Sequence, residues 1–594
     1  MTYLCLCVAV MLLTATVICA WSLNSRSNKR QMMITPLNVM FAGVLMTAVL
    51  LFFPAYWAEQ EGDAFQLLKA LMLSVYSAVR LFAFDSDHDV IREMITGEIA
   101  PVYTAFVSVV MVAAPMLTFS FVLSFFNELV SYGRLLLGYF SPVFVFSELN
   151  DKSLALAADI RRENKHVRLV FTEVFEPSED TGFEQQEQAR NMGAMLFQKD
   201  ILSVNFSVHS KNAPLYFLAV AENEDTNVRH GLGLVELYGN RQYTTLYVFS
   251  SRPESAVLLS SAKPETMRVR RVDEVRSLIN RLLYDEGHLL FDSELPEVNG
   301  EKQITAVVVG MGKHGTAMVK SLSWFCQMYG YRVNIHGFDR DSLAEDTFVA
   351  QCPELMDPKY NGVTVPGEPR YCIKIHSDVD VNTYSFAKQI KELDKTSYVL
   401  VSLGDDDLNI RTAMNLRMLF EQCGAKPRIQ AIVYNSEKCA SLHNLRNFKD
   451  QPYNIDFIGD LEHFYTVKVI LNSEVEREAL RRHLRWGEEQ SFWSFNEYNY
   501  NSSVALAIHA RAKQKQNVPG ANKTEMELTD EERQLLEQLE HRRWNAYMRS
   551  EGYIYSKSPK ASSRNDLGKM HHDLVPYDDL SEEDKRKDSK VAAK

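Results

Sequence analysis

The chain has 594 residues, which is too long for one hydrophobic core and predicts several domains. Its formal net charge is −12. This charge excludes a general binder of nucleic-acid backbones, which needs clustered lysines and arginines. The eight cysteines show no Cys-x-x-Cys or Cys/His spacing. We therefore predict reduced cytosolic thiols, with neither a disulfide framework nor a zinc site.

The first 130 residues contain three uncharged apolar segments, each long enough to span a bilayer, which takes about 20 residues. The basic residues Arg26, Lys29 and Arg30 follow the first segment. By the positive-inside rule this loop is cytoplasmic, the N-terminus lies outside, and everything after residue 130 lies in the cytoplasm. We therefore predict a multi-pass transmembrane region over 1–130, with membrane lipid as its partner. The three predicted spans are Tyr3–Trp21, Ile34–Trp57 and Ile99–Phe126.

A fourth apolar segment, residues 64–84, carries Lys69 and Arg80 almost three helical turns apart, and so on one stripe of a helix. A fourth span would export all later residues to a compartment poor in nucleotides. We therefore predict an amphipathic helix at the outer interface. Two alternatives remain for its cations: they reach the lipid headgroups, or they line an oligomeric pore.

From residue 140 onward, apolar β-type runs alternate with helical stretches, a pattern typical of a parallel sheet with crossover helices. The pattern occurs twice, and corresponding pieces come in the same order. "PVFVF" matches "ITAVVV", and "LYFLAVAENEDTN" matches "SYVLVSLGDDDLN". An internal duplication explains this order. We predict two α/β Rossmann-like units, a first copy over 140–293 and a second copy over 302–485.

The second copy contains "VVVGMGKHGTAMVK", in which Gly310, Gly312 and Gly315 follow a strand, and Asp339 closes the next strand. Such glycines permit a tight turn, the helix N-terminus favours phosphates, and Asp339 accepts from ribose hydroxyls. The alternative is that the glycines only allow close helix–strand packing. The first copy has "SELN" at this turn, where Glu148 takes the place of a phosphate at the helix N-terminus. We expect no dinucleotide there.

These stretches resemble the TrkA-N (KTN, or RCK-type) domains that regulate potassium channels and transporters. "VVVGMGKHGTAMVKSL" resembles the opening of that family, and "LVSLGDDDLNIRTAMNLR" resembles its acidic–Asn motif after strand four. The resemblance covers roughly residues 140–480. It implies binding of NAD(H) or adenine nucleotides and transmission of conformational strain to a pore. No TVGYG-like filter lies between the second and third predicted spans, which argues against a potassium-selective pore in this chain.

The C-terminal part begins with a helical connector and polar linker, 486–527, which ends in "KQKQNVPGANKTEME". Thr529 and Glu532 then predict a capping box, and Gly552 predicts the end of the helix. "LEHRRWNAYMRSEGYIY" and "KMHHDLVPYDDLSEEDKRKD" are similar to the RyR domain, the repeat named for ryanodine receptors. This similarity predicts a small, mainly α-helical RyR domain over 528–594.

Eleven positions carry the similarity to the RyR domain, although Tyr553 stands where tryptophan is usual and His572 where proline is usual. Aromatic faces with lysine and histidine suit a purine and its phosphates. The alternative is that the aromatic residues only form the small core of this module. The matching positions are Glu540, His541, Trp544, Gly552, Tyr553, Tyr555, His571, Leu574, Pro576, Tyr577 and Lys585. We predict that His541, Trp544, Tyr553, Tyr555, His571, Tyr577 and Lys585 contact the nucleotide.

Bacterial chains that combine these parts resemble effectors of nucleotide-signal defence systems. The leading hypothesis is a homo-oligomeric, ligand-gated effector of the bacterial inner membrane that senses an NAD-derived, adenine or cyclic nucleotide. It has no enzymatic activity and no nucleic-acid partner. The main alternative is an NAD(H)-sensing regulator of ion (potassium) transport. A membrane-anchored dehydrogenase is a third hypothesis, but no second domain supplies a substrate pocket.

Two short stretches, one rich in carboxylates and one with two histidines, could be read as metal sites. "GDDDLN" (404–409) is either a metal-binding cluster or a solvated acidic turn at the end of a strand. His571 and His572 have no cysteine or third histidine at a suitable spacing. We expect no metal site and no catalytic residue.

Overall fold

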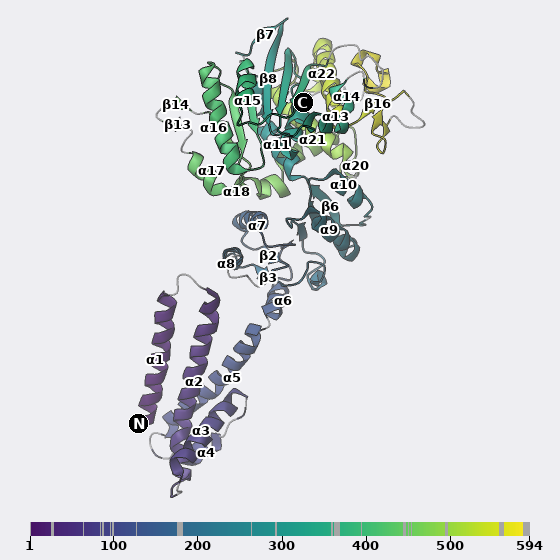
Figure 1. The fold of residues 1–594 in the computed structure, drawn as a ribbon. Coiled ribbons are helices and arrows are strands. Elements are labelled where there is room, and N and C mark those ends of the chain that lie inside the picture. The colour runs from purple at the N-terminus through teal and green to yellow at the C-terminus, as the bar shows by residue number, and fades with distance from the viewer. Residues whose placement is uncertain are drawn as a thin grey trace. The chain divides into compact units, whose positions relative to one another are not determined.

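The structure is a computed structural model in which the chain divides into two compact units, Met1–Tyr139 and Phe140–Lys594 (Figure 1). It describes residues 2–24, 29–62, 65–83, 85, 88–94, 97, 100–125, 127–174, 182–262, 264–291, 294–357, 360, 369–393, 395–443, 447–448, 451–452, 454–493, 497–557 and 564–585.

The regular elements of the first unit are all helices in its described residues. The long helices α1, α2 and α5 contribute apolar residues to one core together with the shorter α3. The helices are α1 (Thr2–Asn24), α2 (Lys29–Glu59), α3 (Gln66–Phe82), α4 (His88–Met94), α5 (Ala100–Phe125) and α6 (Asn127–Leu137).

Helix α3 buries its small and polar side chains and exposes most of its large apolar ones, although Leu81 and Phe82 at its end are buried. Ser74 and Ser77 are fully buried, and the Ser77 hydroxyl hydrogen-bonds with the Tyr56 hydroxyl of α2 at 2.7 Å. This distribution is the reverse of a helix on a water-soluble protein, and it suits a helix whose outer face meets lipid. The exposed side chains include Leu67, Leu68, Leu71, Met72, Val75 and Val79.

The two cations of α3 lie near its opposite ends. Arg80 forms an ion pair with Asp85 at 2.6 Å and lies 5.4 Å from the centroid of the Tyr76 ring. Arg80 is therefore held by neighbours within the first unit, and the choice between headgroup contact and pore lining stays open.

Two helices among the described residues are long and apolar enough to cross a membrane, Val39–Glu59 and Ala100–Phe119. Only 39% and 33% of these segments are buried inside the structure, so most of their apolar surface faces outward. Within α1, the first predicted span, Cys5–Val17 is a shorter apolar helix. Three spans are thus not confirmed. Arg26, on which the predicted topology depends, lies outside the described residues.

The second unit contains two Rossmann-like parallel sheets with the same strand order, as the duplication predicts. In the first copy the order is β3-β2-β1-β4-β5-β6, and all neighbours are parallel. The strands are β1 (Val143–Phe146), β2 (Arg168–Phe171), β3 (Met195–Leu196), β4 (Leu215–Ala219), β5 (Thr244–Phe249) and β6 (Arg268–Val272). The helices are α7 (Asp151–Glu163), α8 (Phe183–Asn191), α9 (Glu224–Tyr238), α10 (Pro253–Ser260) and α11 (Glu274–Glu286).

The second copy repeats this order as β10-β9-β8-β11-β12-β15, with β7 (Glu297–Val298) added antiparallel to β8. The strands are β8 (Glu301–Val309), β9 (Tyr331–Phe338), β10 (Tyr371–His376), β11 (Tyr398–Val401), β12 (Arg428–Ile432) and β15 (Ile455–Ile458). The helices are α12 (Lys313–Phe325), α13 (Ala344–Gln351), α14 (Pro353–Met356), α15 (Tyr384–Glu392), α16 (Asp406–Gln422) and α17 (Ser436–His443); β13 (Asn447–Phe448) and β14 (Gln451–Pro452) form a hairpin.

The central strands form because their runs of valine, isoleucine, leucine and phenylalanine are buried on both faces. All four residues of β1 and of β11 are buried. Helices cover both faces of such a sheet, so its strands need no polar alternation. The carboxyl end of β8 leads into the turn for which the sequence predicts a phosphate site. The carboxyl end of β1 leads into the corresponding turn of the first copy, for which the sequence predicts none.

The C-terminal part packs onto the second copy through α22, which lies against α12. Trp324 of α12 and Tyr547 of α22 have ring centroids 6.1 Å apart. Thr529 and Glu532 form the predicted capping box, and Gly552 follows the helix with a φ of +84°. The elements are α18 (Leu461–Phe464), a π-helix (Val467–Leu471), α19 (Glu474–His483), α20 (Glu489–Phe492), α21 (Tyr498–Lys515), α22 (Asp530–Ser550), β16 (Ile554–Tyr555), β17 (Arg564–Asn565) and β18 (Met570–His571).

The segment 513–527, predicted as a polar linker, packs into the second unit. Val518 and Ala521 are buried, and both belong to a hydrophobic core that continues from the first copy to the C-terminal part. The preceding helix α21 is buried along most of its length. The boundaries 486–527 and 528–594 stay predictions, since the described residues of 140–594 form one compact unit.

Candidate functional site

The glycine turn, residues 310–315, joins β8 to α12 and needs two of its glycines for packing. Gly310 has a φ of +93°, and a Cβ there would lie 2.4 Å from the Ser402 carbonyl oxygen. A Cβ on Gly315 would lie 1.8 Å from the Gly310 carbonyl oxygen. For these two positions the packing explanation is sufficient.

Gly312 has no such reason to be glycine. Its φ of −65° and ψ of −164° suit any residue, and a Cβ at this position would meet no heavy atom of the described residues within 4 Å. It is also the N-cap of α12, and its missing side chain leaves the first amides of that helix without a side-chain acceptor. Open space beside uncapped amides at a helix N-terminus is the arrangement that binds phosphate.

Asp339 lies beside this turn, as the sequence predicts. Its Oδ2 accepts a hydrogen bond from the Met311 amide at 2.6 Å, and its Oδ1 accepts from the Asp341 amide at 2.8 Å. The carboxylate is thereby oriented at the end of β9, next to the place where a ribose follows the diphosphate in Rossmann sites.

The first residues of α12 form the rim of the site, and the first copy supplies the partners of Lys313. Lys313 Nζ donates to Glu224 Oε1 at 3.0 Å and to Ser251 Oγ at 2.9 Å. Burial opposes ionisation of Glu224, but bonds from Lys313 and two serine hydroxyls outweigh it and lower its pKa to about 2. The glycine turn of one copy is therefore tied to the other copy by a charged pair.

His314 and Tyr434 face each other on the same rim, with His314 Nε2 3.0 Å from the Tyr434 hydroxyl. Burial and the neighbouring Lys313 lower the pKa of His314 to about 4, so its imidazole is neutral at pH 7. A neutral imidazole and a phenol offer hydrogen bonds rather than charge to a ligand. The sequence motif contains Lys313 and His314, but no local signal marks Glu224 or Tyr434 as their partners.

The corresponding turn of the first copy, residues 147–150, is filled by its own side chains. Asn150 caps α7: its Oδ1 accepts from the Ser153 amide at 2.9 Å, and its Nδ2 donates to the Val220 carbonyl at 2.8 Å. Glu148 accepts from Asn150 Nδ2 at 3.3 Å. The residue that occupies the helix N-terminus is thus Asn150 and not Glu148, because the amide side chain reaches the first turn.

The asparagine shared by "AENEDTN" and "GDDDLN" has the same structural role in both copies. Asn227 accepts from the Ala221 amide at 2.6 Å and donates to the last carbonyl of β5 at 2.9 Å. Asn409 accepts from the Leu403 amide at 2.7 Å and donates to the last carbonyl of β12 at 2.8 Å. These residues fix the loops after the fourth strands.

Each carboxylate of "GDDDLN" has a partner within the second copy. Asp405 caps the first turn of α16, Asp406 accepts from the Tyr434 amide at 3.1 Å, and Asp407 pairs with Lys438 at 2.7 Å. These contacts match the interpretation of the segment as an acidic turn.

Four of the predicted RyR residues form an aromatic cluster with Trp544 at its centre. The Trp544 ring centroid lies 5.8 Å from that of His541 and 4.9 Å from that of His571, and Tyr577 lies 6.0 Å from His541. Lys585 Nζ is 5.6 Å from the Tyr577 ring centroid. The structure therefore brings five predicted contacts together.

Other RyR-matching positions are engaged in holding the module in place. Tyr553 is buried and donates to Asp566 Oδ1 at 2.9 Å, and the Tyr555 amide donates to Glu354 Oε2 at 2.7 Å. Glu540 forms a buried ion pair with Arg543 at 2.7 Å. The packing alternative thus accounts for Tyr553 and Glu540, and partly for Tyr555.

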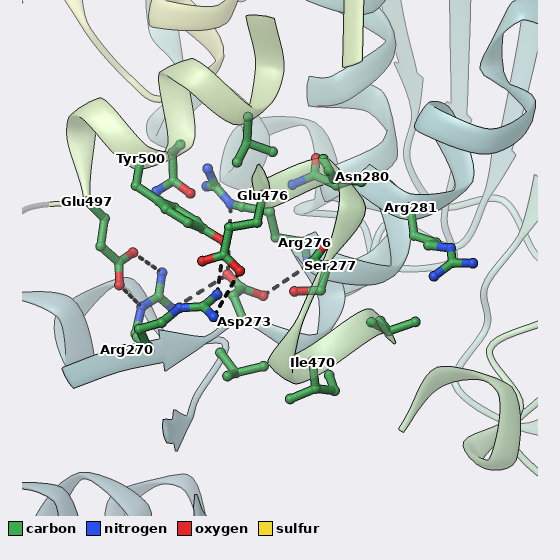
Figure 2. A pocket seen from close by; sticks show the side chains of 17 residues that line it. Arg270, Asp273, Arg276, Ser277, Asn280, Arg281, Ile470, Glu476, Glu497 and Tyr500 are labelled. Atoms are coloured by element: carbon green, nitrogen blue, oxygen red, sulfur yellow. Dashed lines mark hydrogen bonds and ion pairs between the residues drawn. The ribbon is translucent and has the colours of Figure 1, made fainter. Parts of the chain in front are cut away.

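A pocket between the first copy and the C-terminal helices is lined by several arginines (Figure 2). Arg270 pairs with Glu476 at 2.9 Å, and Arg271 pairs with Glu497 at 2.7 Å. Burial outweighs the arginines and raises the pKa of Glu476. These ion pairs join β6 to α19 and to the N-cap of α21. Because Arg270 and Arg271 are already ion-paired, the pocket offers a phosphate few free cations.

No model of a known protein family matches the chain, and no curated protein matches it. Two solved structures are similar over long stretches. A mutant of GsuK is 14% identical, with 73% of this chain and 98% of that chain covered and a TM-score of 0.35. A dipicolinate synthase subunit from Bacillus halodurans is 10% identical, with 56% and 94% covered and a TM-score of 0.20. At such TM-scores neither similarity indicates a ligand or an activity.

Proposed function

We propose that the chain is a membrane-embedded, nucleotide-sensing effector. A soluble nucleotide binds within residues 140–594 and shifts a homo-oligomer between a closed state and one in which the helices of residues 1–130 make the membrane permeable. A ligand shifts such an equilibrium only by its differential affinity for the two states. The proposed setting is a bacterial inner membrane, without enzymatic activity or nucleic-acid partner, and with antiphage defence as the process served.

The observation that carries this proposal is Gly312. Packing explains Gly310 and Gly315, whereas a Cβ on Gly312 would meet no neighbour among the described residues, and the close approach of a ligand accounts for the missing side chain there. The uncapped N-terminus of α12 and the oriented carboxylate of Asp339 supply the complementary groups for a diphosphate and a ribose. The first copy supports the contrast, because Asn150 caps the equivalent helix.

Lys313 could couple nucleotide binding to the contact between the two copies. A phosphate at the N-terminus of α12 would compete with Glu224 for the ammonium group of Lys313, whose side chain is 63% exposed. Bound nucleotide would then weaken a contact between the two copies. This is a differential contact of the kind that a switch requires.

The second candidate function is an NAD(H)-sensing regulator of ion (potassium) transport, which the TrkA-N resemblance favours. Both functions use the same pocket. They differ in the consequence of binding: the effector makes its own membrane segment permeable, whereas the regulator acts on the selectivity or rate of a transport protein. Flux measurements on liposomes that contain only this chain distinguish them.

Gly312→Val is expected to weaken nucleotide binding at least about tenfold, or about 1.4 kcal/mol, because its side chain fills the space that phosphate would occupy. It is expected to lose no more than about 1 kcal/mol of stability, the cost of a less favourable N-cap, since a Cβ at this position meets no neighbour among the described residues. The measurement is titration calorimetry of the full chain in detergent with NAD⁺, NADH, ADP, ADP-ribose and cyclic AMP.

Glu148→Gln is the matched control in the first copy, where we expect unchanged nucleotide affinity. Wild-type binding by Gly312→Val would contradict the assignment of the second copy as the nucleotide site. A wild-type chain that binds none of the five nucleotides would contradict the proposed function itself.

If the aromatic cluster stacks on a base, Tyr577→Ala is expected to raise the nucleotide concentration needed to trigger permeability about ten- to a hundredfold. Lys585→Met is expected to act in the same direction through loss of a phosphate contact. The measurement is nucleotide-dependent dye release from liposomes that contain the full chain, with the same five nucleotides.

Tyr577→Phe separates stacking from structure. It keeps the ring and removes only the hydroxyl, which donates to Glu537 Oε2 at 2.6 Å. We expect it to respond to ligand almost as the wild type does. An undiminished response of Tyr577→Ala would show that the C-terminal module is not the receptor, and the second copy would then carry that role alone.

A further inference from the structure

Three side chains with metal-ligating atoms meet at the carboxyl ends of β2 and β3 in the first copy. Glu173 follows β2, Asp200 follows β3, and His230 lies on α9. Their candidate ligand atoms all lie within 4.8 Å of one another. His230 Nε2 is 3.1 Å from Asp200 Oδ2 and 3.8 Å from Glu173 Oε1. Small shifts of such atoms permit the roughly 2.0–2.2 Å bonds of a shared cation.

The cluster is held by the fold rather than by flexible surface side chains. His230 is fully buried, and its Nδ1 has no hydrogen-bond partner among the described residues. Asp200 uses Oδ1 to accept from the Leu202 amide at 2.7 Å, which leaves Oδ2 for the cluster. Fixing one carboxylate oxygen and presenting the other is how ligand carboxylates are oriented in metal sites.

The backbone at Glu173 adds a second sign of a built site. Its φ of +55° lies in the left-handed region, which a residue with a Cβ rarely adopts. The Glu173 amide donates to the Lys199 carbonyl at 2.8 Å, which holds this conformation. The strained residue is the one that carries the carboxylate into the cluster.

Among the described residues, the charges of the cluster are not balanced by a buried cation of the protein. Arg229 Nη2 lies 3.7 Å from Asp200 Oδ2, but the Arg229 side chain is 63% exposed. Arg229 Nη2 also lies 3.3 Å from His230 Nε2, the nitrogen that faces both carboxylates. A divalent cation would satisfy two carboxylates and an imidazole lone pair at once.

The described part of the second copy lacks this cluster, although its fold is the same. Asp380 takes the place of Asp200 and accepts in the same way from the amide two residues later, at 2.8 Å. Arg340 is the second residue after β9, as Glu173 is after β2, and Thr412 follows Asn409 as His230 follows Asn227. The copy with the glycine turn therefore has other residues at the ligand positions, and the copy with the ligands has no glycine turn.

We propose that Glu173, Asp200 and His230 bind a divalent transition-metal ion in the first copy. Two carboxylates with one imidazole suit Mn²⁺ or Zn²⁺, whereas Ca²⁺ prefers an all-oxygen site. The ion joins β2, β3 and α9 at the sheet edge where a Rossmann fold otherwise holds its nucleotide. The proposal does not depend on nucleotide binding by the second copy.

The test uses the full chain in detergent, stripped with EDTA and dialysed. Mn²⁺ binding is followed by the loss of the free-ion EPR signal, and Zn²⁺ binding by competition with a chromophoric chelator. We expect one Mn²⁺ or Zn²⁺ per chain at this cluster, much weaker binding of Ca²⁺ and Mg²⁺, and a rise in melting temperature with the bound ion. Glu173→Gln and Asp200→Asn are expected to weaken binding at least about tenfold.

Two controls make the outcome decisive. Asp380→Asn changes the equivalent carboxylate of the second copy, and His572→Gln disrupts the other His/Asp group, in which His572 Nε2 pairs with Asp573 at 2.9 Å. Both are expected to bind the metal as the wild type does. The proposal is wrong if the stripped wild type binds neither ion, if Ca²⁺ binds as tightly as Mn²⁺, if Glu173→Gln retains full affinity, or if His572→Gln removes the ion.

Discussion

Gly315→Ala is expected to lower the free energy of unfolding by roughly 3 kcal/mol or more, since overpacking of this severity exceeds ordinary core insertions. A Cβ at this position would lie 1.8 Å from the Gly310 carbonyl oxygen and 3.2 Å from the Ser402 hydroxyl. The nearest atom is backbone, so α12 or the turn must move. Thermal unfolding of the full chain in detergent is the measurement, with a fall of about 3 °C or more for a cooperative unit of roughly 450 residues.

Gly312→Ala is the control for this variant, three residues away in the same turn. Its added Cβ meets no heavy atom of the described residues within 4 Å, so we expect a loss of at most about 1 kcal/mol, from the less favourable N-cap, which is well below that of Gly315→Ala. Equal losses at both positions would contradict the division of the motif into packing glycines and a ligand-facing glycine. The pair thus resolves the two interpretations of one sequence pattern.

Glu540→Gln is expected to destabilise the protein by roughly 3–5 kcal/mol at pH 7, because it leaves buried cations without their counter-charge. Glu540, Arg543 and Lys513 have side chains that are 3%, 1% and 2% exposed. Lys513 Nζ lies 3.9 Å from Glu540 and has no hydrogen-bond partner among the described residues. Denaturant unfolding of the full chain measures the loss.

This loss is expected to shrink above pH 8. Burial, opposed by Glu540, lowers the pKa of Lys513 to about 8, whereas an unfolded lysine titrates near 10.4. Between these values the unfolded chain holds a proton that the folded chain has released, so wild-type stability rises with pH. Once Lys513 is neutral, removal of Glu540 costs less.

Lys513→Met is the companion variant. It removes the titrating group, so the extra pH dependence between about 8 and 10.4 is expected to disappear, with little loss of stability at pH 7. A Glu540→Gln loss that is the same at pH 7 and pH 9.5 would contradict the role given to Lys513.

The sequence was sufficient to predict both sheets because their central strands are local patterns. Runs such as "ITAVVV" are buried on both faces, and such burial requires apolar residues at consecutive positions. The strand Arg268–Val272 carries no such signal, because three of its five residues are arginine. It forms because Glu476 and Glu497, far along the chain, neutralise two of those arginines.

The candidate nucleotide site was predictable only in part, for a similar reason. Gly310, Gly312, Gly315 and Asp339 are predictable from the spacing of one βαβ unit, which is local. The partner of Lys313 is Glu224, 89 positions earlier, and only the packing of the two copies brings them together. The cluster of carboxylates and histidine in the first copy escaped prediction likewise, because its ligands come from three separate loops and helices.

The RyR resemblance identified residues that do gather, but the polar composition of 513–527 does not predict that part of this segment is buried. Lysines, glutamines and asparagines dominate the segment, and a composition of that kind is typical of exposed linkers. The few apolar residues it contains include Val518 and Ala521, and these two are buried. Average composition does not reveal that a short segment anchors itself through two side chains.

The continuous core of residues 140–594 has a consequence for how this unit comes apart. Side chains of the first copy, the second copy and the C-terminal part belong to one buried cluster, which extends from Phe144 to Leu574. Removing α22 would uncover Trp324 and its neighbours on α12, the helix that begins at the glycine turn. We therefore expect the three parts to unfold together and truncation of any one of them to destabilise the other two, although their sequence patterns are those of separate modules.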